Sequence, residues 1–135
     1  MGEVHPAVKA VVLDGNRFLV LETVIGEKRV WDLPGGRVKH GESPYGALNR
    51  EIKEETGLKV DIVDSLGVYW YLRVTDGKQI VCNAFSCKPK SLDVSLPPNG
   101  VFIKSSKWVT KEEFLSNDFV VDNESLKELI SEKVT

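Results

Sequence analysis

The stretch GESPYGALNREIKEETGL, residues 41–58, decides the fold because it carries helix signals at both of its ends. Ser43 is a preferred N-cap residue, and Pro44 suits the first position of a helix. Gly57 is the residue expected just past a helix C-terminus. Together these signals predict a helix over residues 44–56.

The apolar residues of this helix predict which side is buried. Tyr45, Leu48 and Ile52 recur at i, i+3 and i+7, so we expect them to form the buried stripe. The other side chains of interest then face a cleft or water: Ala47, Glu51, Glu54 and Glu55.

Three carboxylates within about one helical turn repel one another, typically by about 0.2–0.5 kcal/mol per pair. Glu51 and Glu55 are four residues apart and point in nearly the same direction, so both can reach one hard divalent cation or two neighbouring ones. Glu54 lies one step around the same edge. A solvated helix face is the alternative, because charge runs usually face water. Mg²⁺ prefers a few carboxylates together with water and phosphate oxygens, so a polyphosphate would complete such a site.

The segment before the helix favours an anionic ligand. Pro34 and the Gly35-Gly36 pair interrupt regular structure and let the backbone approach a ligand closely. A loop that leads into a helix N-terminus also presents unpaired N–H groups, which suit anions. We interpret residues 30–43 as a shaped loop.

Antiparallel hairpins flank this loop and helix. The turn Asp14-Gly15-Asn16 separates two apolar, β-branched runs, and Asp76-Gly77 has the same chemistry. Residues 24–29 read as a connection. Further strands are predicted at about 59–65, 67–75, 78–87 and 101–109.

Two helices are predicted after the last strand. Thr110 and Glu113 have capping-box spacing at the start of TKEEFL, and DNESLKELISEKV is amphipathic with Leu126, Leu129 and Ile130 facing inward. Strands, a helix, strands and helices follow one another, with both hairpins and longer crossings. This order predicts an α/β fold, an α/β/α sandwich with a mixed β-sheet.

Length and composition limit the remaining possibilities. The chain has 135 residues, of which 41% are hydrophobic, and fits a single domain over residues 1–135. A formal net charge of −2 provides no basic field for duplex nucleic acid. No apolar run has the length of a membrane span or a signal peptide. Cys82 and Cys87 lack further zinc ligands and read as buried thiols, which predicts a cytoplasmic location.

Residues 36–58, GRVKHGESPYGALNREIKEETGL, resemble the signature of the Nudix hydrolases without departure. The signature is Gly, five residues, Glu, seven residues, and then Arg-Glu-apolar-any-Glu-Glu-any-Gly-apolar, with Ile52 and Leu58 in the apolar slots. The motif is very specific and covers 23 of the 135 residues. The resemblance, to MutT-like members in particular, implies hydrolysis of a nucleoside diphosphate linked to another group, with Mg²⁺ or Mn²⁺ as cofactor.

The match to the motif also implies roles for individual residues. Glu51 and Glu55 resemble metal ligands, and the Gly36 carbonyl resembles an additional one. Glu54 resembles either a further ligand or the base that activates water. The physical account agrees, because cations that bridge phosphate oxygens neutralise the charge that builds up on the leaving phosphate.

Arg50 occupies the position of a structural residue in the motif. It is expected to bridge to Glu51 or Glu42 and so to orient the carboxylates. Direct contact with a substrate phosphate is the alternative. Glu42, at the helix entrance, either orients the site or reaches the metal.

Many relatives use one more acid beyond the motif. Residues 97–108, PPNGVFIKSSKW, contain no Asp or Glu. Asp93 is the nearest earlier candidate, whereas Glu112 and Glu113 are better explained by helix capping. Glu54 is therefore favoured as the base.

Aromatic residues are candidates for holding the nucleobase. Trp31 directly precedes the loop, and VYWYLR alternates, so that Trp70 lies on one face of a strand and two tyrosines lie on the other. Stacking on a base is worth about 1–3 kcal/mol in comparable settings. Core packing is the alternative for each aromatic and is our assignment for Trp108. Basic loop residues can meet phosphate or remain solvated: Arg37, Lys39 and His40.

A nucleoside triphosphate is the predicted substrate by elimination. ADP-ribose or another nucleotide sugar is the alternative, but the proline typical of ADP-ribose enzymes is not near Arg73. The tyrosine typical of dinucleoside polyphosphate enzymes is not near Thr75. A non-catalytic nucleotide-sensing module is a further alternative, although such a protein would be expected to lose a metal glutamate. The expected partner is a small-molecule nucleotide, and a homodimer stays open as the assembly.

Overall fold

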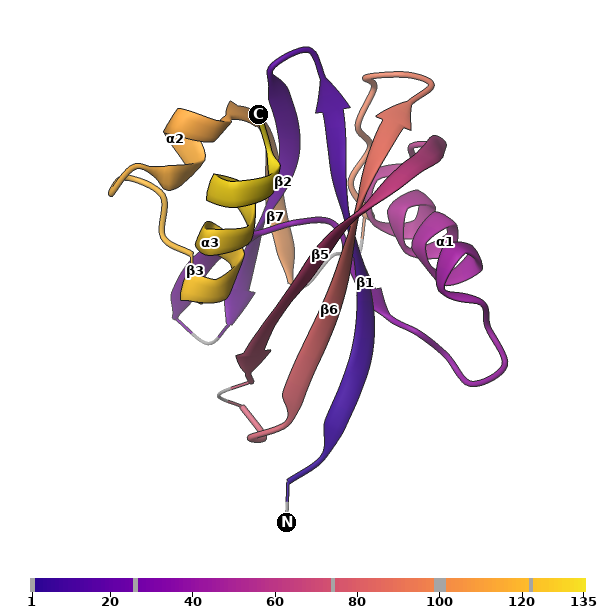
Figure 1. Ribbon diagram of the computed structural model, residues 1–135, viewed down its shortest axis with the longest axis vertical. Helices are drawn as coiled ribbons and strands as arrows, with labels where there is room; N and C mark the ends of the chain where they lie inside the picture. The colour runs from indigo at the N-terminus through magenta and orange to yellow at the C-terminus, as the bar shows by residue number, and fades with distance from the viewer. Residues whose placement is uncertain (1, 26, 74, 99–101, 122) are drawn as a thin grey trace.

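The computed structural model describes residues 2–25, 27–73, 75–98, 102–121 and 123–135. Figure 1 shows how its helices and strands are arranged. In chain order these elements are β1 Val4–Asp14, β2 Arg17–Ile25, β3 Lys28–Asp32, β4 Gly35–Arg37, α1 Pro44–Thr56, β5 Val60–Leu72, β6 Gln79–Pro89, β7 Ile103–Thr110, α2 Lys111–Leu115 and α3 Glu124–Lys133.

Strand β1 lies at the centre of a mixed sheet. It pairs in parallel with β6 along most of its length, and in antiparallel with β4. Strand β5 extends the sheet beyond β6 in antiparallel. Strand β2 follows β1 through a tight hairpin and pairs in antiparallel with β3 and β7. The expected mixed sheet is therefore confirmed.

Helices cover both faces of this sheet. Helix α1 lies on one side, and helices α2 and α3 lie on the other, as Figure 1 shows. Each side has its own buried hydrophobic cluster: Leu48 and Ile52 of α1 belong to one, and Phe114 and Leu126 belong to the other. The structure thus confirms the α/β/α sandwich.

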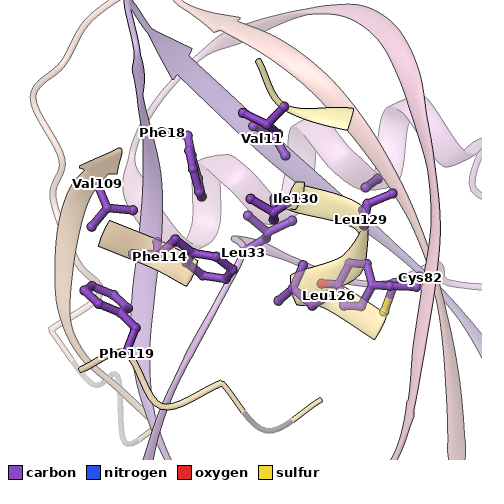
Figure 2. Packing of buried hydrophobic residues seen from close by; sticks show 14 of the residues in the cluster. Val11, Phe18, Leu33, Cys82, Val109, Phe114, Phe119, Leu126, Leu129 and Ile130 are labelled. Atoms are coloured by element: carbon purple, nitrogen blue, oxygen red, sulfur yellow. The ribbon is translucent and has the colours of Figure 1, made fainter. Parts of the chain in front are cut away.

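The cluster under α2 and α3 is rich in aromatic side chains (Figure 2). The rings of Phe18 and Phe114 meet edge to face, with 5.4 Å between their centroids. Trp31 reaches the same cluster, with its ring 5.1 Å from that of Phe119. Because aromatic pairs bury large areas, this packing fixes the end of β3, where the candidate site begins.

Helix α1 has the predicted ends. The hydroxyl of Ser43 accepts a hydrogen bond from the Gly46 N–H, and Gly57 has a left-handed φ of 73°. The predicted buried stripe was wrong in two places. Tyr45 is 58% exposed and packs at the edge of the helix against Phe85, whereas Ala47 is fully buried. The small side chain of Ala47 lets the helix approach the sheet closely, which turns the buried face toward that position.

The strands differ from the prediction in two respects. The expected pair at 59–65 and 67–75 is one strand, β5, whose pairing register shifts twice between Ile62 and Gly67. Residue 74 lies outside the described residues. Strands β3 and β4 occupy segments expected as a connection and a loop, because their backbones pair with β2 and β1. The predicted strand at 101–109 corresponds to β7, which begins at Ile103; residue 102 precedes it, and residue 101 lies outside the described residues.

The C-terminal helices agree with the prediction. Thr110 and Glu113 form a complete capping box, and Leu126, Leu129 and Ile130 are buried. The two predicted thiols are free and buried: Cys82 and Cys87. Among the described residues, none of the helices has the length and apolar character needed to cross a membrane.

Candidate functional site

Strand β4 brings its two glycines against β1 and α1. Gly35 has a φ of 140°, and a Cβ on it would lie 2.1 Å from the Val8 carbonyl oxygen. A Cβ on Gly36 would lie 2.6 Å from the carboxylate carbon of Glu51. Only glycine fits at these two places, so the Gly-Gly pair sets the close approach of β4 to the carboxylates of α1.

Arg50 organises the acidic face of α1. Its guanidinium donates to both Glu42 and Glu51, the two partners between which the sequence could not choose, with Nη1 2.9 Å from Glu51 Oε1. It also donates to Glu54 at 3.2 Å and to the Arg37 carbonyl at 3.3 Å. Hydrogen bonds from Arg50 and from the Lys39 N–H lower the pKa of Glu42 to about 2. Arg50 therefore holds the helix entrance, α1 and β4 in one arrangement.

Glu55 is the most enclosed carboxylate of the group. Its Oε1 accepts a 2.7 Å hydrogen bond from the Gly35 N–H. Burial raises the pKa of Glu55 to about 7, although the charge of Lys9 and the Gly35 hydrogen bond act in the opposite direction. Glu54 differs, since its side chain is 57% exposed.

The donor set suits a hard divalent cation. Glu51, Glu54 and Glu55 supply carboxylate oxygens, which Mg²⁺ and Mn²⁺ prefer, and burial is the main cause of the raised pKa of Glu55. In this structure Arg50 donates hydrogen bonds to Glu51 and Glu54, and the Gly35 N–H donates one to Glu55. Accordingly, no three acidic, His or Cys side chains among the described residues converge on one point. The metal roles of these residues and of Gly36 stay predictions.

A pocket of about 370 Å³ opens beside Glu55, whereas Glu51 and Glu54 lie outside its lining. Its walls include Gly36, Arg37 and Glu55, and also the aromatic side chains of Trp31 and Tyr71. Trp31 and Arg37 line this pocket, and their role in binding a substrate stays a prediction. Its full lining is Lys9, Thr23, Val24, Val30, Trp31, Asp32, Gly35, Gly36, Arg37, Glu55, Tyr71, Arg73, Phe102 and Asn123.

Trp70 does not lie with this group. Its side chain is 49% exposed, its backbone exchanges hydrogen bonds with Ser125, and it does not line the pocket. Strand alternation places the neighbouring Tyr71 in the pocket instead. The structure thus gives no support to the predicted stacking role of Trp70.

A buried polar network at the pocket was missed by the sequence reasoning. Lys9 Nζ lies 3.1 Å from Asp32 Oδ2, and the hydroxyl of Tyr69 donates to Asp32 Oδ1 at 2.9 Å. Burial opposes the charge of Lys9, but Asp32 and other neighbouring groups outweigh it and raise the pKa of the ammonium above its ordinary range. A signal was present in the sequence, because a lone lysine interrupts the apolar run of β1.

The other candidate residues lie elsewhere. Lys39 and His40 do not line the pocket, although the Lys39 N–H donates to Glu42. Asp93 is exposed and also lies outside the pocket. The last two candidates line a separate hollow at α2, on the opposite face of the sheet from α1: Glu112 and Glu113. Trp108 packs against the α1-side cluster, as expected of a core residue.

Comparisons with known proteins bear on this site. A MutT-like protein of Streptomyces ambofaciens is 37% identical over 108 residues, which cover 76% of this chain and 61% of that protein. An RNA pyrophosphohydrolase of Saccharophagus degradans is 40% identical over 64 residues, or 47% of this chain and 38% of that protein. The crystal structure of a MutT protein from Methanosarcina mazei Go1 shares the fold, with a TM-score of 0.82 at 23% identity, covering 96% of this chain and 92% of that one.

The chain spans 43% to 61% of the length of three curated relatives that it matches over most of its own length. The model of the NUDIX domain family matches residues 3–129, which include α1, β4 and most of α3. This match shows that the chain belongs to the Nudix family, whose hydrolases act on nucleoside diphosphate derivatives.

Proposed function

We propose that this chain hydrolyses a phosphoanhydride bond of a nucleoside diphosphate derivative, with a nucleoside triphosphate as the first candidate substrate. One observation carries the proposal: the acidic face of α1 packs against β4, where Glu55 lines a pocket that also has Trp31 and Tyr71 in its walls. A nucleotide would match these features with an anionic polyphosphate, bound through a cation, and a flat nucleobase.

Glu51, Glu55 and the Gly36 carbonyl would hold Mg²⁺ or Mn²⁺, and Glu54 would be either a further ligand or the base. When bound, the cation would neutralise charge on the phosphate oxygens and make water a stronger acid. The protein itself contributes orientation, because Arg50 fixes Glu51 and Glu54 relative to β4.

Glu54 is our candidate for the base that takes the proton from the attacking water. The side chain of Glu54 is 57% exposed, whereas that of Glu51 is 17% exposed, and Glu54 lies on the helix edge beside Glu51. Glu54 shares Arg50 with Glu51, whereas Glu112 lines a separate hollow at α2 and Asp93 lies in the exposed segment after β6. The reaction would then depend mainly on positioning, as is usual in phosphoryl transfer.

The nucleobase of the substrate would lie against the aromatic side chains that line the pocket. Trp31 and Arg37 both line the pocket, where an aromatic ring would suit a base and a guanidinium would suit phosphate. Nucleotide sugars and dinucleoside polyphosphates are alternative substrates that present the same two features. The free thiols of Cys82 and Cys87 suit a reducing cytoplasm.

A substrate panel tests the proposal. Nucleoside triphosphates, ADP-ribose, a dinucleoside tetraphosphate and 5′-triphosphorylated RNA would each be incubated with Mg²⁺, and products identified by mass. We expect turnover that Glu54→Gln loses and that the control variant Glu112→Gln retains. Nucleotide binding without turnover of any of these compounds would favour the sensing module instead.

A further inference from the structure

We propose that Lys9 and Tyr71 make the pocket select nucleobases that present a carbonyl oxygen over those that present an amino group at the same position. This inference deepens the proposed function and rests on it, because it takes the pocket lined by Lys9, Trp31 and Tyr71 as the place of the nucleobase.

Lys9 occupies an unusual position for a lysine. It lies in the central strand β1 between buried apolar residues, and only 7% of its surface is exposed. Its side chain runs along Gly35, where a Cβ would lie 3.0 Å from Lys9 Cδ. The stem of Lys9 is therefore held against β4, and its ammonium cannot swing out to the solvent as surface lysines do.

The ammonium of Lys9 has an unused donor. It carries three protons, and its acceptors among the described residues are two, Asp32 Oδ2 at 3.1 Å and the Leu33 carbonyl at 3.3 Å. Lys9 lines the pocket, so the remaining N–H is available to a bound molecule. Leaving a buried charged donor without an acceptor costs free energy. A ligand that supplies an oxygen to this donor therefore binds more tightly.

Tyr71 adds a second donor at the same place. It lines the pocket, and its hydroxyl makes no hydrogen bond with any other residue that the structure describes. Lys9 and Tyr71 are close enough to influence each other electrostatically. A carbonyl oxygen has two lone pairs and can accept from both groups.

The charge around Lys9 argues for a neutral acceptor rather than a phosphate. Asp32 forms an ion pair with the ammonium, and the Glu55 carboxylate also acts on it. A phosphate placed against Lys9 would meet these two negative groups, whereas a base carbonyl would not be repelled. An exocyclic amino group would direct its own N–H toward the ammonium and leave both donors without an acceptor.

Matched nucleotide pairs provide the test. ITP and ATP differ at position 6 of the purine, and UTP and CTP differ at position 4 of the pyrimidine, by a carbonyl in place of an amino group. We expect kcat/KM to favour ITP over ATP, and UTP over CTP, by about 10–100-fold, the range of one hydrogen bond to a charged donor. The binding of IMP and AMP, measured by calorimetry, gives the same comparison without turnover.

The variants remove one donor at a time. Lys9→Met keeps the length of the side chain, and Lys9→Met combined with Asp32→Asn avoids a lone buried carboxylate. We expect both variants to bring the two ratios to within about threefold of one, and Tyr71→Phe to reduce them in part. Lys88→Met, which removes an exposed lysine from β6 outside the pocket, should leave the ratios unchanged.

The outcomes are distinguishable. Turnover without a carbonyl preference, or a preference that survives in the double variant, would overturn the inference and leave the proposed function standing. Preferential binding of IMP without turnover of any nucleotide would refute the proposed hydrolysis and leave the carbonyl preference standing. Binding of inorganic phosphate that depends on Lys9 would assign the ammonium to a phosphate and refute the inference, as would the absence of binding by all of these nucleotides.

Discussion

Neutralising Glu55 should make the metal-free protein more stable at neutral to alkaline pH. Glu55 is enclosed between α1 and β4, and burial raises its pKa from an ordinary value of 4.5 to about 7. Glu55→Gln removes the charge but keeps an oxygen that can accept from the Gly35 N–H, which lies 2.7 Å away. The substitution therefore removes the cost of burying a charge and keeps the local hydrogen bond.

The sign and the pH window follow from the direction of the shift. A carboxyl group with a raised pKa in the folded state binds its proton more tightly there than in the unfolded chain, so protonation favours folding. This contribution is fully present below about pH 4.5 and is lost as the pH rises through about 7. A shift of this size corresponds to about 3 kcal/mol as an upper value.

Urea unfolding at several pH values between 5 and 9, in the presence of a chelator, measures the effect. The difference in free energy of unfolding between Glu55→Gln and the parent should grow by about 2–3 kcal/mol across that range, in favour of the variant. Glu112→Gln, at an exposed position on α2, is the control and should show no such trend. A difference that does not change with pH would refute the view that Glu55 is a strained, buried charge.

Chelation should abolish turnover and Mg²⁺ or Mn²⁺ should restore it; full activity in excess chelator would refute a metal-dependent reaction. Glu54→Gln should lower turnover by about 10²–10⁴ with nearly unchanged metal affinity, as expected for a general base. Glu51→Gln and Glu55→Gln should instead bind Mn²⁺ more weakly and regain activity at high metal concentration. Equal rescue of all three variants would make Glu54 a ligand. Lys9→Met should lower the free energy of unfolding by about 3 kcal/mol, because it leaves Asp32 buried without its cation, and Asp32→Asn should restore most of that loss. A single variant as stable as the parent would show that Asp32 is well solvated.

The parts of the molecule that the sequence predicted correctly depend on local chemistry. Helix α1 begins after Ser43 and ends before Gly57 because an N-cap side chain and a left-handed glycine act within a few residues. The same holds for the capping box at Thr110. The bridge from Arg50 to Glu51 or Glu42 was also predictable from the motif, and the structure shows both contacts.

The parts that the sequence did not predict depend on partners far away in the chain. Ala47 is buried because α1 approaches the sheet closely, and periodicity alone does not contain that distance. Strands β3 and β4 are short and are defined by pairing with β2 and β1 rather than by their own residues. The pocket needs Lys9, Asp32 and Tyr71, which come from three strands, so no single stretch of sequence indicates it.

The carboxylates around Arg50 and the ion pair of Lys9 with Asp32 therefore differ in how freely they can rearrange. The Arg50 guanidinium is 22% exposed and shares its hydrogen bonds among several carboxylates, so it can give up Glu51 or Glu54 to a divalent cation while it keeps Glu42. Lys9 is more deeply buried, and its one carboxylate partner, Asp32, is itself held by the Leu33 N–H and the Tyr69 hydroxyl. Moving Lys9 would leave a buried charge unpaired, so the ion pair of Lys9 with Asp32 is rigid. Adaptable carboxylates around Arg50 suit a reaction shared by many relatives, whereas a rigid Lys9 suits discrimination among nucleobases. Substitutions at Lys9 should therefore change which nucleotide is used more than how it is cleaved.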